Sequence, residues 1–376
     1  TFYVKEGVGQ ISGKAFVDTK SMIYDAQVKA HQLQLQRLMP RLGLQPFSGN
    51  LAFKGSGTDV FSPKTRLDLS AAIEQFAYNH YKLNNVKANA TIKNGRAKVF
   101  VDSKNELLYG TIEADALMSK RLVDATAVCN LSKADLYKLR IVDEPLTVGF
   151  RGRVGLITDL KDNYKAFGDV DNIIVRDSTK DYHPQHVFFN AVTRRDSTYA
   201  NVSSGDFQLQ LNAKGGYKYL LKQGNALSSI VQKQIRNKQF DYLQIQNKLP
   251  LAHINLTTGP NNMFMKILKR YGYKIGSANI DMQASPSMGL NGSAEIYDIY
   301  AQANRIDTVR FNMVSQDNQL KYTAQVRNAP GNPQYVFNAL FDGSVLNKDL
   351  TLNTKLYDSK NKLALALGLQ GEIEPK

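Results

Sequence analysis

Two histidines, His183 and His186, lie beside Asp181, and imidazole and carboxylate groups are common metal ligands. A protein metal site needs three or four converging ligands, however, and the segment 177–185 has the composition of a polar loop. We therefore interpret the pair as solvated loop histidines and expect no metal site. The remaining histidines stand singly in alternating segments: His31, His80 and His253.

Signatures of catalysis or cofactor binding are weak in this chain. The glycines of 7–13 resemble a dinucleotide-binding loop, but their spacing differs from that of the motif. The segment is also followed by a strand pattern, whereas the dinucleotide-binding loop is followed by a helix. No nucleophile elbow, phosphate-binding loop or kinase signature is present. Cys129 is the one cysteine, which excludes an internal disulfide, and we interpret it as a small apolar strand residue. We expect no enzymatic activity and no cofactor.

A short signature recurs along the chain, namely an apolar residue, a polar residue, Gly, any residue, and an apolar residue. Glycine inside a strand usually marks a bulge, a sharp twist or a close backbone approach. Recurrence of one small unit is typical of repeat architectures. The five copies are 11–15, 47–51, 150–154, 290–294 and 369–373.

Alternation of apolar and polar residues dominates the chain and predicts β-strands. Lys93-Asn94-Gly95 and the segment 315–318 have the chemistry of tight hairpins, so successive strands should pair antiparallel as one long meander. We predict an all-β fold and one continuous repeating array over residues 1–376. The clearest alternating segments are 24–36, 66–78, 81–92, 96–102, 106–117, 121–129, 186–194, 207–214, 277–284, 293–303, 306–314, 319–327, 350–356 and 363–367.

Helical spacing interrupts this pattern in one region, 217–271, which we interpret as a helix-containing insertion. Apolar residues at helical spacing predict one short amphipathic helix over 225–240 and another over 262–271, while Pro40 limits the segment 37–43 to a single turn. We expect the two helices to cover the sheet or plug its hollow. The alternative, a basic helix on a membrane surface, is less favoured because both are short and only moderately basic.

The formal net charge of +15 raises the question of an anionic partner. The 48 Lys and Arg residues are spread over strand surfaces. Nucleic-acid-binding proteins, in contrast, concentrate their basic residues on one face. We expect solvated strand faces and no nucleic-acid partner; among binding functions, contact with anionic headgroups is favoured. No run of 18 apolar residues is present to span a membrane.

Period 2 also assigns side chains to faces, because alternate residues of a strand point the same way. A long sheet with one apolar face must close, stack or hold an apolar ligand. We predict that this face lines a hollow for acyl chains, with Gln210 pointing to the other side. The candidate lining residues are Phe207, Leu209, Leu211, Leu350, Leu352, Leu356, Leu363, Leu365 and Leu367.

Several of these segments resemble the TamB family, the inner-membrane-anchored members of the translocation and assembly module, which are related to AsmA. The resemblance extends over nearly the whole chain and is closest to Bacteroidetes versions. It is carried by patterns rather than catalytic residues. The segments that carry it are 24–40, 47–57, 134–139 and 201–217, followed by the helix that begins near Asn225.

The resemblance implies an elongated β-meander curled into an open, taco-shaped groove. In such proteins the groove carries phospholipid acyl chains through the periplasm between the two membranes, with an outer-membrane barrel protein as partner. The chain would then be an internal segment, and membrane contact would come from an inner-membrane anchor helix outside it. The alternative is a scaffold that assists assembly and secretion of outer-membrane barrels by offering sheet edges to client strands, without lipid transport.

Overall fold

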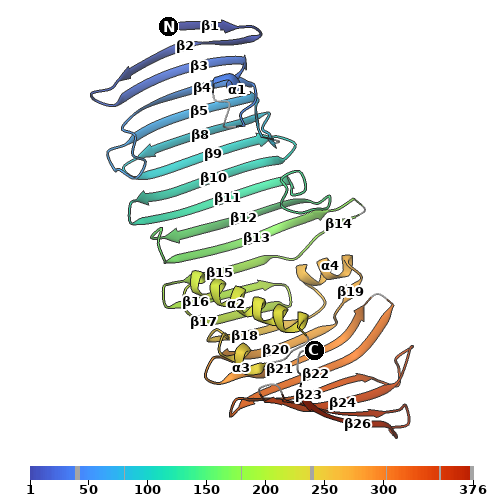
Figure 1. Cartoon of the computed structure of the whole chain (residues 1–376). Helices are drawn as coiled ribbons and strands as arrows, with labels where there is room; N and C mark the ends of the chain where they lie inside the picture. Colours follow the sequence, from blue (N-terminus) through green and yellow to red (C-terminus); the bar gives the residue numbers. More distant parts are fainter. Residues whose placement is uncertain are drawn as a thin grey trace. The chain divides into compact units, whose positions relative to one another are not determined.

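The computed structural model describes residues 1–38, 43–79, 81–178, 180–237, 241–301, 303–346 and 349–372. Strands account for 63% of the chain and helices for 10%, which confirms the predicted all-β fold. The chain divides into two compact units, residues 1–186 and 187–376, whose elements are labelled in Figure 1. Continuity of one array across both units stays a prediction.

Unit 1 is an open antiparallel meander in which each long strand pairs with the next long strand along the chain. Two short strands, β6 and β7, pair with each other outside this sheet. Its elements are β1 (Phe2–Glu6), β2 (Gly9–Asp18), β3 (Ile23–Leu33), α1 (Leu35–Leu38), β4 (Phe47–Ser56), β5 (Arg66–Gln75), β6 (Ala77–Tyr78), β7 (Tyr81–Lys82), β8 (Val86–Lys93), β9 (Arg96–Lys104), β10 (Leu108–Ser119), β11 (Leu122–Asp135), β12 (Thr147–Thr158), β13 (Tyr164–Arg176) and β14 (Asp181–Tyr182).

Unit 2 repeats the open antiparallel meander and adds three helices. Its elements are β15 (Val187–Thr193), β16 (Ser197–Ser204), β17 (Phe207–Lys214), α2 (Tyr217–Arg236), α3 (Tyr242–Gln246), β18 (Ala252–Thr258), α4 (Met263–Arg270), β19 (Tyr273–Lys274), β20 (Ser277–Ser285), β21 (Gly289–Ala301), β22 (Asn304–Gln316), β23 (Gln319–Asn328), β24 (Phe337–Leu346), β25 (Asp349–Tyr357) and β26 (Leu363–Glu372).

The predicted hairpins form where left-handed backbone is available. Asn94 and Gly95 have φ values of 54° and 72°, and they join β8 to β9 with Lys93 paired to Arg96. Asp317 and Asn318 have φ values of 53° and 62° and join β22 to β23 in the same way. Two-residue turns with positive φ match the right-handed twist of the strands, and they fix the register of each hairpin.

Four of the five glycines of the recurring signature lie where neighbouring backbones come close. A Cβ on Gly13 would lie 2.1 Å from the carbonyl oxygen of Gln27, and one on Gly292, whose φ is 145°, would lie 2.1 Å from that of Asp281. No side chain fits at such a distance, so the predicted close backbone approach is confirmed at these two positions. Gly371 differs, since a Cβ there meets nothing within 4 Å.

The helices differ from the predicted pair in number and length. Helix α4 matches the prediction over 262–271, but α2 begins at Tyr217, well before the expected Asn225, and α3 and α1 are additional. Most of the predicted turn around Pro40, residues 39–42, lies outside the described residues, as does His80. The segment 217–271 also contains β18, a strand of the sheet. Among the described helices, none combines the length and apolarity needed to cross a bilayer.

Candidate functional site

Strand pairing places one apolar face on the sheet of unit 2. Residues directly opposite each other on neighbouring strands point to the same side, so a side can be followed from strand to strand. From Leu209 of β17 the pairs lead outward to Val202 on one side and to Leu256 on the other. Continued through β26, this row consists of Leu256, Ile280, Ala294, Phe311, Ala324, Phe341, Thr354 and Leu367.

A parallel row starts at Leu211 and brings further predicted residues onto the same face. It ends with Leu352 paired to Leu369. A third row, on the other side of the row of Leu209, ends with Leu356 paired to Leu365. The row from Leu211 consists of Ile254, Met282, Gly292, Met313, Tyr322, Gly343, Leu352 and Leu369. Residues far apart in sequence on β17, β25 and β26 therefore share one surface. We call this surface the apolar face of unit 2.

Three predicted residues need separate description. Phe207 lies on the same side of β17 as Leu209, and Leu350 on the same side of β25 as Leu352. Leu363 lies beyond a register shift between Leu356 and Tyr357, and it pairs with Tyr357, so the pairing does not assign it to this face. Thr354 interrupts the otherwise apolar side of β25 with a hydroxyl group.

Unit 1 carries a matching apolar face that the predicted site residues did not include. One of its rows runs through β3 to β13 as Ala26, Phe53, Leu69, Ala90, Val99, Ala114, Ala127, Val154 and Gly168. The adjacent row is Val28, Leu51, Ala71, Ala88, Val101, Ile112, Cys129, Gly152 and Val170. Neither row contains a charged residue. The alternation of apolar and polar residues in these strands predicts this face too, but the predicted lining residues all lie on three strands of unit 2, β17, β25 and β26.

The opposite side of each sheet carries the charges. In unit 1, Lys54 lies 3.8 Å from Asp25, and Arg96 contacts Asp115 at 2.6 Å. In unit 2, His253 Nε2 lies 2.9 Å from Asp281 Oδ1. Gln210 belongs to this polar side, paired with Asn201 and Asn255. The contrast between the two sides is therefore chemical as well as geometric.

Helix α4, as predicted, and the additional helix α3 cover parts of the apolar face of unit 2. Tyr242 of α3 is 1% exposed and packs against Leu320 and Val345, with Leu290, Met313, Tyr322 and Leu350 around them. Its hydroxyl group accepts a hydrogen bond from the Leu290 amide at 3.0 Å. Phe264 of α4 packs on Phe207 with ring centroids 4.1 Å apart.

Outside these covered parts, in β18 and in the edge strand β26, the apolar face is accessible. Ile254, in the row of Leu211, is 40% exposed, and Leu367 on β26 is 46% exposed. Contiguous apolar surface of more than a few hundred Å² is unusual on a soluble monomer and marks a binding surface. The apolar face of unit 2 is thus available to an apolar ligand.

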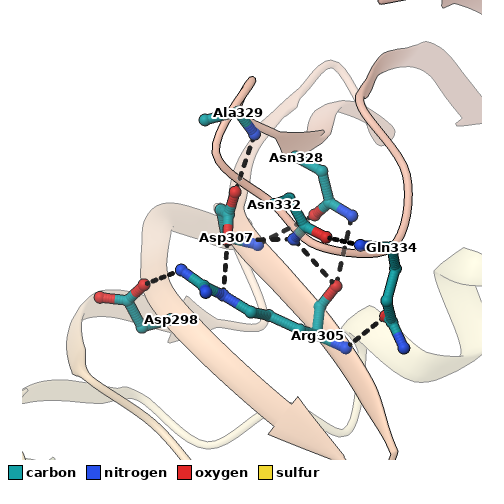
Figure 2. A network of polar contacts seen from close by, with 7 residues as sticks. All are labelled: Asp298, Arg305, Asp307, Asn328, Ala329, Asn332 and Gln334. Atoms are coloured by element: carbon teal, nitrogen blue, oxygen red, sulfur yellow. Dashed lines mark hydrogen bonds and ion pairs between the residues drawn. The ribbon is translucent and has the colours of Figure 1, made fainter.

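A polar network lies where the apolar rows of β21 to β23 end (Figure 2). The Arg305 guanidinium lies 2.9 Å from Asp307 and 3.5 Å from Asp298; the first contact is an ion pair without hydrogen-bond alignment. Asn328 and Asn332, both buried, donate to the Arg305 carbonyl oxygen at 3.2 and 3.4 Å. The network holds the loop after β23 in place and puts charged groups at the edge of the apolar surface.

An open cleft of about 1000 Å³ lies at the ends of β16, β17, β18 and β20. Its lining mixes small apolar residues, such as Ala213 and Ala284, with the charged residues Arg194, Asp196 and Lys214. This composition suits an amphiphile better than a purely apolar molecule.

The cysteine and histidine side chains do not come together in one site. Cys129 lies in an apolar row between Ile112 and Gly152, as the sequence predicted, and burial raises the pKa of its thiol. His186 contacts Asp169, and Asp181 pairs with Arg176 at 3.1 Å. Within the described ranges, no group of three His, Cys, Asp or Glu residues could hold a metal ion.

The comparisons with known proteins add no relative. No family model, no curated protein and no solved structure matches the chain.

Proposed function

We propose that the apolar faces bind the acyl chains of phospholipids and that the protein carries lipid across the periplasm, in the manner of the TamB family. The observation that carries this proposal is the apolar face itself, traced by pairing from β3 to β13 in unit 1 and from β16 to β26 in unit 2. The apolar face offers almost no hydrogen-bonding side chains, so it suits a ligand, such as an acyl chain, that has no hydrogen-bonding groups of its own.

The energetics favour a flexible apolar ligand. Burial of a methylene group is worth about 0.8 kcal/mol, so a chain that lies along either face gains affinity with each strand it crosses. Because these rows contain no charged residue, no position along them holds an acyl chain in one place. A surface of this kind supports movement along the sheet as well as binding, which a conduit requires.

The scaffold alternative places the binding energy in the backbone of sheet edges and expects side chains to fill the interior. Half-exposed residues such as Ile254 and Leu367 support the conduit instead. Localisation in the periplasm, anchorage through a helix outside this chain and an outer-membrane barrel partner belong to the proposal and rest on the family resemblance alone.

Lipid analysis of the purified protein tests the proposal. We expect the chain, expressed in a bacterial periplasm, to co-purify with phospholipid detectable by native mass spectrometry and by organic extraction. The double variant Leu209→Glu with Leu352→Glu should lose most of it, whereas Gln210→Glu with Gln325→Glu, both on the polar side and the second beside Arg310, should retain it. Protein free of lipid, or equal lipid in both variants, would contradict the proposal.

A further inference from the structure

The Lys and Arg residues are spread along the chain, but its net positive charge is concentrated in the helical region of unit 2, where acidic residues are nearly absent. Residues 214–274 contain eleven Lys or Arg residues and a single acidic residue, Asp241, which gives this segment ten of the fifteen net positive charges. The strands elsewhere carry nearly balanced charge. Such a concentration raises the local potential and favours an anionic partner.

Helix α2 orders four of these cations into one stripe. Lys218, Lys222, Lys233 and Arg236 are separated by 4, 11 and 3 residues, and all four side chains are exposed. With 3.6 residues per turn, these spacings return to the same side of a helix. The helix contains no acidic residue that would neutralise the stripe.

The opposite side of α2 is turned toward the protein. Leu220, Leu227, Ile230 and Val231 are half-buried, and Gln234 is buried. The Tyr217 amide donates to Thr193 Oγ1 of β15 at 2.9 Å, and Gln234 Nε2 donates at 3.1 Å to the carbonyl oxygen of Asp241, the N-cap residue of α3. Figure 1 shows α2 lying across the strands of the sheet. Both ends are therefore fastened, and the cationic stripe is held in one orientation.

Two large apolar side chains beside the cationic stripe are exposed to solvent. Ile235 is 72% exposed and Leu221 is 61% exposed. Helix α4 has a similar composition, with exposed Lys269 and with Ile267 46% exposed. Exposed apolar residues beside cations, on a helix parallel to a surface, suit the boundary between lipid headgroups and acyl chains. A phosphate backbone of nucleic acid offers no counterpart for Leu221 and Ile235, so a membrane fits this surface better.

We propose that α2 binds the surface of an anionic phospholipid bilayer through Lys218, Lys222, Lys233 and Arg236, with Leu221 and Ile235 inserted at the headgroup boundary. The docked bilayer would lie beside the apolar face of unit 2, because α2 is fastened to Thr193 and, through α3, to the rows of that face. The inference rests on charge and exposure, and it holds whether or not the apolar faces conduct lipid.

Vesicle flotation of the whole chain tests this surface. We expect binding to equimolar phosphatidylglycerol and phosphatidylcholine vesicles, little binding to phosphatidylcholine alone, and release by salt. Replacing the four α2 cations with Gln should weaken binding on the order of a hundredfold or more, since each Lys or Arg near an anionic surface contributes about fivefold. Leu221→Ser with Ile235→Ser should weaken it further.

A matched variant keeps the result interpretable. Lys321, Arg327, Lys355 and Lys360 are exposed on strands and a turn of the same unit, and replacing them with Gln removes the same net charge. This control should bind as the wild type does. Equal weakening in both variants, unchanged binding after loss of the α2 cations, or tighter binding to a DNA duplex than to vesicles at equal phosphate concentration would overturn the proposal. Circular dichroism checks that each variant is folded, and lipid co-purification tests the conduit proposal separately.

Discussion

Replacement of Leu209 by Glu places a carboxyl group in the middle of the apolar face of unit 2. Its cross-strand neighbours are Val202 and Leu256, and neither offers a cation or a hydrogen-bond donor from its side chain. A carboxylate covered by an acyl chain must therefore lose its hydration or become protonated. Binding of lipid should be weakened through this one group.

The cost of protonation sets the magnitude. A Glu side chain with an ordinary pKa of about 4.3 requires about 3.7 kcal/mol to be neutral at about pH 7, which corresponds to about a 500-fold rise in Kd. At about pH 5 the same cost falls to about fivefold. The variant should therefore regain most of its affinity as the pH is lowered, whereas the wild type should show little change.

Titration with a phosphatidylcholine that carries a pyrene-labelled acyl chain measures this effect, because the zwitterionic headgroup keeps its net charge over this pH range. Gln210→Glu adds the same charge on the polar side and should bind like the wild type. Leu209→Gln, which is neutral, should lose some affinity without pH dependence. Equal loss at positions 209 and 210, or a loss at 209 that does not diminish at low pH, would refute the assignment of faces.

Three further perturbations test separate parts of the structure. Because burial raises the pKa of the Cys129 thiol, alkylation near neutral pH should be slower at Cys129 than at a cysteine placed on the polar side by Val128→Cys in a Cys129→Ala background; equal rates would contradict the apolar row. Tyr242→Ala should lower the free energy of unfolding by about 3–5 kcal/mol in urea titrations, and an unchanged midpoint would show that α3 does not hold this core. The Asn163 amide and side chain hold the pKa of Asp159 far below its usual range, so this carboxylate stabilises the fold above about pH 3.9 and ceases to do so as the pH falls toward its folded pKa. Asp159→Asn should therefore reduce the acid-induced fall in Tm, and identical profiles would contradict a stabilising role for these hydrogen bonds to Asp159.

The sheet and its faces follow from the sequence because the side-chain period of a strand is two and hairpin turns fix the register. Asn94-Gly95 determines how β8 pairs with β9, and that pairing aligns Ala90 with Val99 on the apolar face. Strand β13 is harder to recognise. Asp169 and Asp171 keep the alternation on its polar side, but Asn172 has a φ of 49° and the register shifts there, which breaks regular alternation.

The helices are less predictable for local reasons. The residue before α2 is Gly216, which offers no side chain to cap the first turn, so the usual signal for a helix start is missing. Helix α3 has only five residues, too few to show a period. Its role comes from Tyr242, whose contacts with Leu320 and Val345 join distant parts of the chain. The cationic stripe of α2 also depends on the helix beginning at Tyr217, because a start at Asn225 leaves out Lys218 and Lys222.

Site-specific photo-crosslinking to lipid in living cells tests the central claim most directly. A photoreactive amino acid is placed at neighbouring positions on opposite sides of one strand in each unit, Leu209 and Gln210 in β17, and Ala90 and Asn89 in β8. If acyl chains lie on the apolar faces, phospholipid should be attached at positions 209 and 90 and be nearly absent at 210 and 89. Equal labelling on both sides, or labelling on neither, would contradict the account.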